Sequence, residues 1–278
     1  MSSSSSKAFG SSPRTWIDSH CHLAADEFAG DRGDVLARAR AAQVEACVVV
    51  GSGYGIAGNT RAAELATREA DCFATVGVHP HEAQELDDAG RALLDSLLGH
   101  ARVVGVGETG LDYHYMKSPR DVQRAVFAEQ VALARSRHLP VSLHVRGDEP
   151  NAFEELLDIW RAEGRGEVEG VLHCYTGTLD FALRALREGL YVSFSGILTF
   201  KKDKGLRAVA AGLPLERLLV ETDAPLLAPE GQRGRRNEPA HVAKVGQALA
   251  DAHGLSVEKV AHATAHNARA LFGLGSPA

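Results

Sequence analysis

Two histidines alternate near the N-terminus in the segment Asp18-Ser-His20-Cys-His22, directly after a short apolar run. Successive side chains of an extended chain point to opposite faces, so both imidazoles face the same side. Imidazole nitrogens are common ligands of divalent metal ions in proteins. The spacing therefore offers two ligands for one ion, although two solvated residues at a strand end would give the same pattern.

Four later apolar runs each end near one more residue that can bind a metal: Glu108, His144, His173 and Asp223. A single histidine in such a place is more often a hydrogen-bonded core residue than a ligand. Four such residues, added to His20 and His22, favour a shared site. Glu108 could instead cap a helix or lie in a surface loop, but we interpret it as a ligand. We interpret Asp112, four residues further on, as a turn residue.

Six candidate ligands exceed the number that one tetrahedral catalytic ion uses. A shared carboxylate such as Glu108 could bridge two ions a few ångströms apart, which would activate water and stabilise the attacking and leaving oxygens of a displacement. We therefore predict a binuclear divalent centre in which Glu108 is shared. Asp223, at a strand end beside the water, is the predicted proton acceptor.

Repeated strand and helix units must position these residues. Runs with strand character occur at 15–19, 46–50, 72–76, 103–106, 141–143, 171–172, 191–194 and 217–220. Helical spacing occurs at 35–42, 60–70, 123–137, 153–162, 241–252 and 257–271. The alternation predicts a parallel α/β sheet, in either a barrel or an open doubly wound form. Polar residues at the ends of many strands favour a single-domain (β/α)8 TIM barrel over residues 15–278, because an open sheet offers one crevice.

The two ends of the chain carry separate signals. Ser256 is placed as the N-cap of the helix at 257–271 and Gly273 as its stop, and we expect this helix to close one end of the barrel. Residues 1–14 are rich in serine and lack the apolar stretch of a secretory signal, so we predict a disordered tail. No later segment is apolar and long enough to predict a membrane span.

Composition limits the classes of function. Hydrophobic residues make up 45% and charged residues 24%, as in folded soluble proteins. The 30 Lys+Arg against 36 Asp+Glu give a formal net charge of -6, so any phosphate-binding surface must be local. Four cysteines without a CxxC pair suit a reducing compartment, and we predict a cytoplasmic location. Cys21 and Cys174 neighbour candidate ligands but are expected to point the other way, as buried apolar residues.

Basic and aromatic residues follow the same predicted strand ends. The basic residues are Arg146, Lys201, Lys202, Lys204, Arg233, Arg235 and Arg236. Charged loops are usually only solvated, but together on one face these residues would attract phosphate. Tyr113, Tyr115 and Phe200 could stack on unpaired bases, although aromatic residues at loop roots more often pack the loop.

From Trp16 to Leu274 the chain resembles the TatD family of metal-dependent deoxyribonucleases, a branch of the amidohydrolase-like barrels. The matching motifs are DSHCHL at Asp18, GVHPH at Gly77, VGETGLDYH at Val106, LPVSLHVR at Leu139, HCYTG at His173, ETDAPLLAP at Glu221 and RNEP at Arg236. Thr109 departs from the family, whose members commonly carry a small apolar residue there, and the Ser-rich head lies outside the match.

The resemblance implies a division of the ligands. One ion would be held by His20, His22, Glu108 and Asp223, and the second by Glu108, His144 and His173. His79 would lie near the substrate phosphate, with Arg146, Asn237 and Glu238 in the wall of the site or behind it. The implied ions are Mg²⁺ or Mn²⁺, while the imidazole content also suits Zn²⁺.

The favoured hypothesis is a hydrolase that cleaves DNA phosphodiester bonds, as an exonuclease acting on single strands or 3′ ends, with no membrane or obligate protein partner. An amide or ester hydrolase of the same barrel type, such as an aminoacyl-tRNA deacylase, would share the metal site but would not need the basic clusters. A non-catalytic scaffold that keeps a structural ion is the third hypothesis, and the complete ligand set argues against it.

Overall fold

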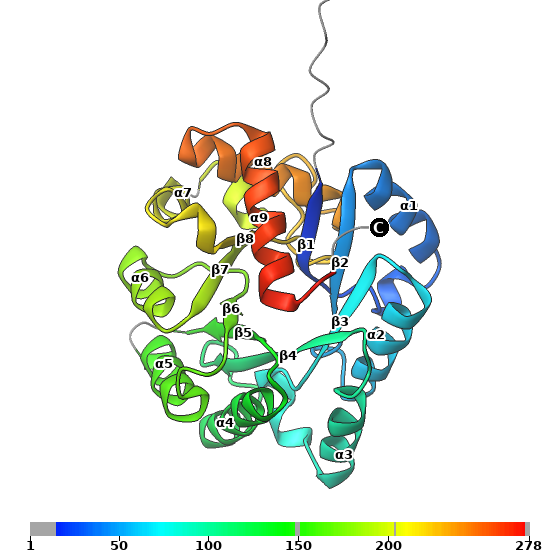
Figure 1. Cartoon of the computed structure of the whole chain (residues 1–278), viewed down its shortest axis with the longest axis vertical. Coiled ribbons are helices and arrows are strands. Elements are labelled where there is room, and N and C mark those ends of the chain that lie inside the picture. Colours follow the sequence, from blue (N-terminus) through cyan, green and yellow to red (C-terminus); the bar gives the residue numbers. More distant parts are fainter. Residues whose placement is uncertain (1–14, 148–150, 203, 276–278) are drawn as a thin grey trace, which may run out of the picture.

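The computed structural model describes residues 15–147, 151–202 and 204–275, and these form a (β/α)8 barrel (Figure 1). Eight parallel strands are paired in the order β1 to β8. They are β1 (Trp16–Cys21), β2 (Val44–Val50), β3 (Cys72–Val76), β4 (Val103–Asp112), β5 (Val141–Arg146), β6 (Gly170–Leu172), β7 (Leu190–Phe194) and β8 (Leu218–Val220). The predicted fold and single domain are confirmed. The tail predicted at 1–14 lies outside the described residues.

The ring closes between its first and last strands through residues at and just beyond the strand ends. The Asp223 N–H donates to the carbonyl oxygen of His20 at 2.9 Å, and the His22 N–H donates to the carbonyl oxygen of Ala224 at 2.7 Å. These two hydrogen bonds place Asp223 directly beside the His20-x-His22 pair, although the two segments are about 200 residues apart in the sequence.

Helices surround the strands. They are α1 (Arg32–Ala41), α2 (Ala57–Arg68), α3 (Asp88–Leu97), α4 (Arg120–Arg137), α5 (Asn151–Gly164), α6 (Leu179–Arg187), α7 (Lys204–Ala211), α8 (Val242–His253) and α9 (Val257–Phe272). Short 3₁₀ helices lie in the connections between strands and helices: η1 (Asp26–Phe28), η2 (Pro80–Glu85), η3 (Gly196–Thr199), η4 (Leu215–Arg217) and η5 (Pro239–His241). The six predicted helices are confirmed to within three residues at each end, while α3, α6 and α7 had not been predicted.

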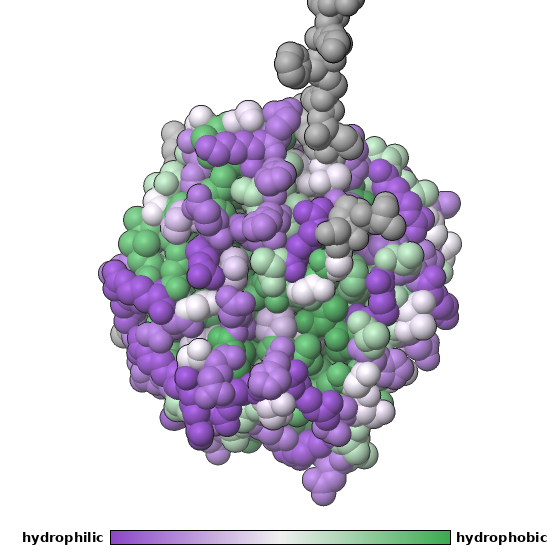
Figure 2. Space-filling model, in the orientation of Figure 1, coloured by the Kyte–Doolittle hydropathy of each residue, from purple (hydrophilic) through white to green (hydrophobic). Residues whose placement is uncertain are grey.

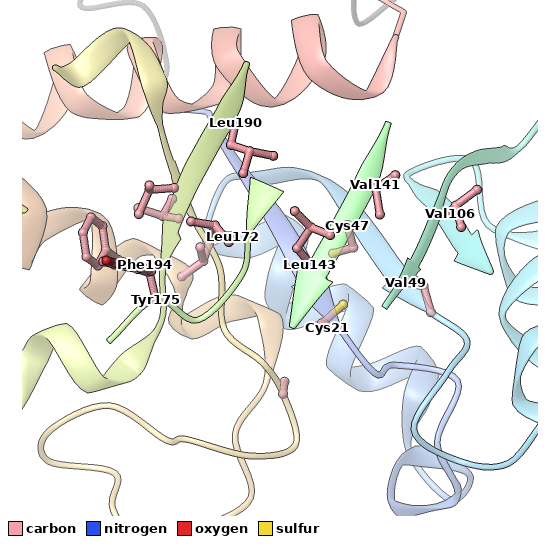
Figure 3. Close-up of a cluster of buried hydrophobic side chains, with 14 of the residues drawn as sticks. Cys21, Cys47, Val49, Val106, Val141, Leu143, Leu172, Tyr175, Leu190 and Phe194 are labelled. Carbon is pink, nitrogen blue, oxygen red and sulfur yellow. The ribbon is translucent and has the colours of Figure 1, made fainter. Parts of the chain in front are cut away.

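The larger part of the core lies between the strands and the outer helices (Figure 3). It contains outward-facing strand residues such as Leu143, Leu172 and Phe194, each fully buried. Cys21 lies in this layer beside Cys47, so its thiol faces away from the neighbouring imidazoles, as predicted from strand alternation (Figure 3). Parallel strands are apolar on both faces because helices cover one side and the barrel interior the other.

A second, smaller core fills the barrel interior at one end. Inward-facing residues of six strands, among them Ile17, Val48 and Leu219, pack against Leu271 and Phe272 of α9. Figure 1 shows α9 lying across the middle of the ring, so the prediction that this helix closes one end is confirmed. The same face in Figure 2 is mostly hydrophilic over the outer helices, with apolar residues showing between them. The opposite end, at the carboxyl ends of the strands, stays open.

The predicted caps of α9 are also confirmed. Ser256 accepts a hydrogen bond from the Lys259 N–H, and Gly273 ends the helix with a φ of 61°. Within the described residues, no helix is apolar and long enough to cross a membrane.

Candidate metal centre

All six predicted ligands meet at the open end of the barrel. Five of them line a cavity of about 570 Å³: His22, Glu108, His144, His173 and Asp223. His20 lies beneath this cavity and is 1% exposed. The β1 pair apart, each side chain comes from the carboxyl end of a different strand. The face formed by these ends is where barrel enzymes carry their active sites.

Two glycines of β4 allow the close approach that brings Glu108 to His144. Gly110 has a φ of 144°, and a Cβ added there would lie 1.9 Å from the carbonyl oxygen of His144. Gly107 has a φ of 132°, and its Cβ would lie 2.6 Å from the carbonyl oxygen of Ser142. Both positions require glycine for the backbone conformation and for space. The β4–β5 pair can therefore place a carboxylate against an imidazole.

The two carboxylate oxygens of Glu108 face two different groups of imidazoles. Oε2 lies 3.4 Å from Nε2 of His20 and 3.9 Å from Nε2 of His22. Oε1 lies 2.7 Å from Nε2 of His173 and 2.8 Å from Nδ1 of His144. Glu108 is 2% exposed, so it cannot rotate out into water without disrupting the barrel end. The Glu108 carboxylate therefore lies between two groups of imidazoles.

The first group has the spacing of a metal shell. Oδ1 of Asp223 lies 3.6 Å from Nε2 of His20 and 3.4 Å from Nε2 of His22, and the two Nε2 atoms are 3.4 Å apart. Ligand atoms bound at typical N or O distances around a tetrahedral ion are about 3.3–3.6 Å from each other. The His20, His22, Glu108 and Asp223 side chains therefore fit one divalent ion.

The second group includes one residue that had not been predicted as a ligand. His79, Glu108 and His144 offer ligand atoms within 4.8 Å of one another, and Nε2 of His79 is 3.4 Å from Oε1 of Glu108. His173 lies between the groups, because it also clusters with His20 and Asp223 and its ring stacks on His20 at 3.9 Å. His79, which was predicted to lie near the substrate phosphate, is therefore part of the cluster around Glu108.

Charges within the cluster are strongly coupled. Burial alone would raise the pKa of Glu108, but the neighbouring imidazoles, His173 first, outweigh it and hold the pKa well below its ordinary value. Burial would lower the pKa of His173, but the Glu108 and Glu221 carboxylates hold it well above its ordinary value. In the absence of a metal, the ionised Glu108 carboxylate and the protonated His173 ring therefore stabilise each other, whereas burial lowers the pKa of His20 and His79.

Asp112 has a larger role than the predicted turn. Its Oδ1 does accept the N–H groups of His114 and Tyr115, at 3.0 and 2.8 Å, which is the turn interaction. Its Oδ2, however, lies 2.8 Å from Nε2 of His81 and 3.2 Å from Nε2 of His144. The sequence did contain the signal: Glu108 and Asp112 are four residues apart, which places them on one face of β4 if that strand extends to residue 112.

Two further residues that were not predicted orient imidazoles. Oε1 of Glu221 lies 3.2 Å from Nδ1 of His173 and accepts the Cys174 N–H at 2.8 Å. The Ser142 hydroxyl lies 3.3 Å from Nδ1 of His20. A partner on the second ring nitrogen fixes the tautomer and direction of a metal-binding histidine. His20 and His173 therefore have the supported geometry expected of ligands.

Replacing Asp112 with asparagine should weaken divalent-ion binding about 10- to 100-fold, because the partner of Nε2 on His144 is lost while the turn acceptor is kept. Titration of metal-stripped protein with Mn²⁺, followed by calorimetry, measures this. The exposed Asp158→Asn variant is the matched control and should bind as the wild type does. Unchanged affinity in Asp112→Asn would contradict a supporting role.

The predicted substrate-side residues lie at different distances from the cavity. Arg146 and His79 line it. Asn237 is fully buried and donates from Nδ2 to the carbonyl oxygens of Thr222 and Leu226, so it shapes the loop that carries Asp223. Glu238 instead pairs with Arg38 of α1 at 2.7 Å and does not line the cavity.

The basic clusters are only partly available to a ligand. Arg236 pairs with Asp31 at 2.6 Å, and the Arg233 guanidinium covers the Phe200 ring at 4.4 Å. Lys201, Lys202 and Arg235 are exposed, without an ion pair among the described residues. Lys117, which was not predicted, lines the cavity beside Arg146.

The interpretation of Cys174 as a buried apolar residue was wrong. Strand alternation does not apply there, because β6 ends at Leu172 and Cys174 has a φ of 44°. Its thiol lies 3.1 Å from the Ser195 hydroxyl, and the half-buried residue lines the cavity. Burial raises the pKa of this thiol well above its ordinary value, so it is not an activated nucleophile.

The fold and the cluster together define a barrel of the metal-dependent hydrolase class. Residues 17–273 match the family described as TatD related DNase.

An uncharacterized metal-dependent hydrolase of Bacillus subtilis, YabD, is 39% identical over 92% of this chain and 98% of its own length. A Shigella flexneri protein named 3′-5′ ssDNA/RNA exonuclease TatD is 33% identical over 93% and 99%. The crystal structure of the Escherichia coli TatD homologue YJJV superimposes with a TM-score of 0.86 at 30% identity, covering 94% of this chain and 98% of YJJV. The chain therefore belongs to the TatD-related family of metal-dependent hydrolases.

Proposed function

We propose that this hydrolase cleaves phosphodiester bonds at DNA ends through a binuclear divalent metal centre. The observation that carries the proposal is the position of Glu108, whose two oxygens face separate groups of imidazoles. The name of the Shigella flexneri relative supports a single-stranded substrate with a 3′ end. Two-ion sites commonly catalyse displacement at phosphate esters, because the ions stabilise both the attacking and the leaving oxygens.

The proposed centre uses two ligand sets that share one residue. His20, His22, Glu108 and Asp223 would hold one ion, and Glu108, His144 and His173 the other, with His79 adjacent to the second. Bound divalent ions would lower the pKa of water and neutralise charge on the attacking and leaving oxygens. Mg²⁺ or Mn²⁺ would suit an oxygen-rich phosphate substrate, while the imidazoles also suit Zn²⁺.

Asp223 is proposed as the acceptor of the proton that the attacking water loses. Burial would raise its pKa, but the hydrogen bond with His22 and the neighbouring imidazoles hold the pKa below its ordinary value. The carboxylate is therefore ionised at neutral pH and lies on the cavity wall. A positioned carboxylate of this kind commonly contributes about 10²–10⁴-fold to the rate.

His79 is proposed to donate a hydrogen bond to a phosphate oxygen. Its Nδ1 accepts the His81 N–H at 3.1 Å, so the proton of the neutral ring resides on Nε2. Burial lowers the pKa of His79 to about 4, which keeps the ring neutral at pH 7. Nε2 faces the Oε1 side of Glu108, where the scissile phosphate would lie.

Two cations complete the proposed substrate pocket. Arg146 and Lys117 both line the cavity, outside the ring of ligands. They would contact phosphates on either side of the cleaved bond, since charge-assisted contacts from Arg and Lys dominate nucleic-acid affinity. The four free cysteines suit a reducing compartment, and we propose the cytoplasm.

Hydrolysis of a carboxylic ester, as in aminoacyl-tRNA, is the competing function. The exposed basic residues Lys201 and Arg235 distinguish the two functions, because only a nucleic-acid substrate needs their charge. The double variant Lys201→Glu with Arg235→Glu should weaken cleavage of single-stranded DNA. The plot of log affinity against log salt concentration should also become less steep, by about 0.7 for each phosphate contact that is lost. Hydrolysis of p-nitrophenyl acetate, if the protein has that activity, should not change.

The matched control reverses two exposed charges at the closed end of the barrel, Lys259→Glu with Arg187→Glu. Its DNA cleavage and salt slope should equal those of the wild type. Unchanged DNA cleavage in the first variant would show that Lys201 and Arg235 do not bind the substrate. Loss of ester hydrolysis alone would favour the competing function.

A further inference from the structure

Three large apolar side chains of the described residues are exposed, and two of them line the metal cavity. Among the described residues they are Tyr115, Met116 and Leu226, with 52%, 46% and 54% of their surface exposed. Tyr115 and Leu226 line the same cavity as the candidate ligands. Their loops follow β4 and β8, which are four places apart in the ring of eight strands and so lie across the barrel from each other. Exposed apolar groups that rim a polar site commonly mark a ligand surface.

Tyr115 is held in place although it is exposed. Its N–H donates to Oδ1 of Asp112 at 2.8 Å. The Arg146 guanidinium lies 4.7 Å from the centre of its ring, within cation–π range. The rings of His81 and His114 stand nearly perpendicular to it, at 5.5 and 4.7 Å between centroids. A ring fixed in advance loses little conformational entropy when a ligand stacks on it.

The other two aromatic residues named from the sequence are used differently. The Tyr113 hydroxyl donates to Glu155 at 2.8 Å, and the Arg120 guanidinium lies over its ring at 4.2 Å. Phe200 lies under the guanidinium of Arg233. Neither Tyr113 nor Phe200 lines the cavity. These two side chains pack their own loops, so Tyr115 is the one of the three that lines the cavity. Tyr54 lines it as well, but its ring lies against His22, at 5.3 Å between centroids.

The surface beside Tyr115 is positively charged. Arg146 and Lys117 line the cavity next to it, and neither has an acidic partner within ion-pair distance in the described parts of the chain. An aromatic ring next to unpaired cations is the combination that binds single-stranded nucleic acid, since the ring stacks on a base and the cations contact the backbone. Charge complementarity therefore favours a nucleotide over an uncharged apolar ligand.

We propose that Tyr115, backed by Arg146, is a stacking platform for one unpaired base next to the scissile phosphodiester. The inference rests on the proposed function and adds to it the residue that selects the substrate. A base in a duplex, including the last pair, must be unpaired and unstacked before it can lie between Tyr115 and Leu226, whereas an unpaired base need not be. Leu226, across the mouth, contacts the base from the other side. The platform thereby favours single-stranded ends over duplex ends.

Kinetics on two substrates test the platform. The substrates are an end-labelled oligothymidylate and an oligomer of the same length made of abasic residues. Tyr115→Ala should raise KM for the thymidylate by roughly 5- to 100-fold, the usual range for losing one base stack, and leave the abasic oligomer unaffected. Tyr115→Phe keeps the ring and should match the wild type, as should Met116→Ala, which removes an exposed apolar neighbour outside the cavity lining.

Binding of fluorescein-labelled oligomers, measured by anisotropy without metal, separates this inference from the proposed function. If the wild type cuts thymidylate and Tyr115→Ala treats both oligomers as the wild type does, the platform is overturned and the nuclease stands. Equal losses on both oligomers would also overturn it, since they would indicate a distorted loop. If the wild type cuts neither oligomer but binds thymidylate more tightly than the abasic oligomer, and only Tyr115→Ala abolishes that difference, the platform stands and the proposed function fails.

Discussion

The Glu108→Ala variant is expected to bind fewer than two divalent ions and to have no measurable phosphodiesterase activity. Glu108 is the residue whose oxygens face both imidazole groups, so its removal takes a ligand from each ion at once. It also removes the carboxylate that His173 and His144 share, which leaves each with its second carboxylate partner, Glu221 or Asp112. Metal content by mass spectrometry and turnover on end-labelled DNA measure the two losses, with the exposed Glu167→Ala variant as the control.

The Asp223→Asn variant separates metal binding from proton transfer. The amide oxygen of asparagine can still lie near His20 and His22, but it cannot accept a proton at neutral pH. We expect most of the bound metal to be kept and kcat to fall by about 10²–10⁴-fold, the usual effect of losing a general base. If Glu108→Ala and Asp223→Asn both cleave DNA as fast as the wild type, the mechanism is wrong.

Metal binding is expected to raise the melting temperature by about 5–10 °C at an ion concentration 100 times the dissociation constant. The reason is that the ligands form a site only in the folded barrel, so the ion stabilises the folded state by mass action. Differential scanning calorimetry of metal-stripped protein, with and without Mn²⁺, measures the shift. The shift should be smaller in Glu108→Ala. No shift in wild-type protein at saturating Mn²⁺ would contradict the site.

At a fixed Mn²⁺ concentration, the shift in melting temperature should grow as the pH rises. Without metal, the pKa of Glu108 is depressed, so its contribution to stability is present above its ordinary value of 4.5 and is lost as the pH falls through the folded pKa. The pKa of His173 is raised, so its contribution is present below 6.5 and is lost as the pH rises through the folded pKa. Above pH 6.5 the metal-free cluster therefore weakens, whereas metal binding strengthens because imidazoles must be deprotonated to bind. A shift that shrinks between pH 6.5 and 8.5 would count against this linkage.

The fold could be predicted because its signals are local. Runs such as residues 46–50 are apolar on both faces, as the strands of a covered parallel sheet are, and Ser256 and Gly273 cap α9 as their residue types require. The three missed helices carry weaker local signals. For example, α7 has only eight residues, and α3 begins in a run that contains glycine.

The candidate ligands could be predicted because parallel strands bring their carboxyl ends to one face, whatever the details of packing. Which imidazole faces which oxygen of Glu108 depends on side-chain rotation, and no spacing in the sequence determines it. His79 is the clearest case, since its Nε2 points at Glu108 only because its Nδ1 accepts the N–H of His81.

Residues that support the ligands were harder to predict. Asp112 was interpreted as a turn residue because β4 was expected to end near residue 106, whereas the strand continues to residue 112 and carries Asp112 to the imidazoles. The position of Glu238 could not be foreseen either. Its carboxylate meets Arg38, a residue about 200 positions away in the sequence, and the pairing is a consequence of how α1 packs.

The central claim is that two divalent ions at this barrel end cleave phosphodiester bonds of DNA. The most direct measurement uses metal-stripped protein and end-labelled single- and double-stranded DNA, re-supplied separately with Mg²⁺, Mn²⁺ and Zn²⁺, with Glu108→Ala alongside. The account predicts a ladder that shortens from one end, faster on single strands, with at least one ion and absent in the variant. Intact DNA with every ion, in protein shown to have bound the metal, would contradict it.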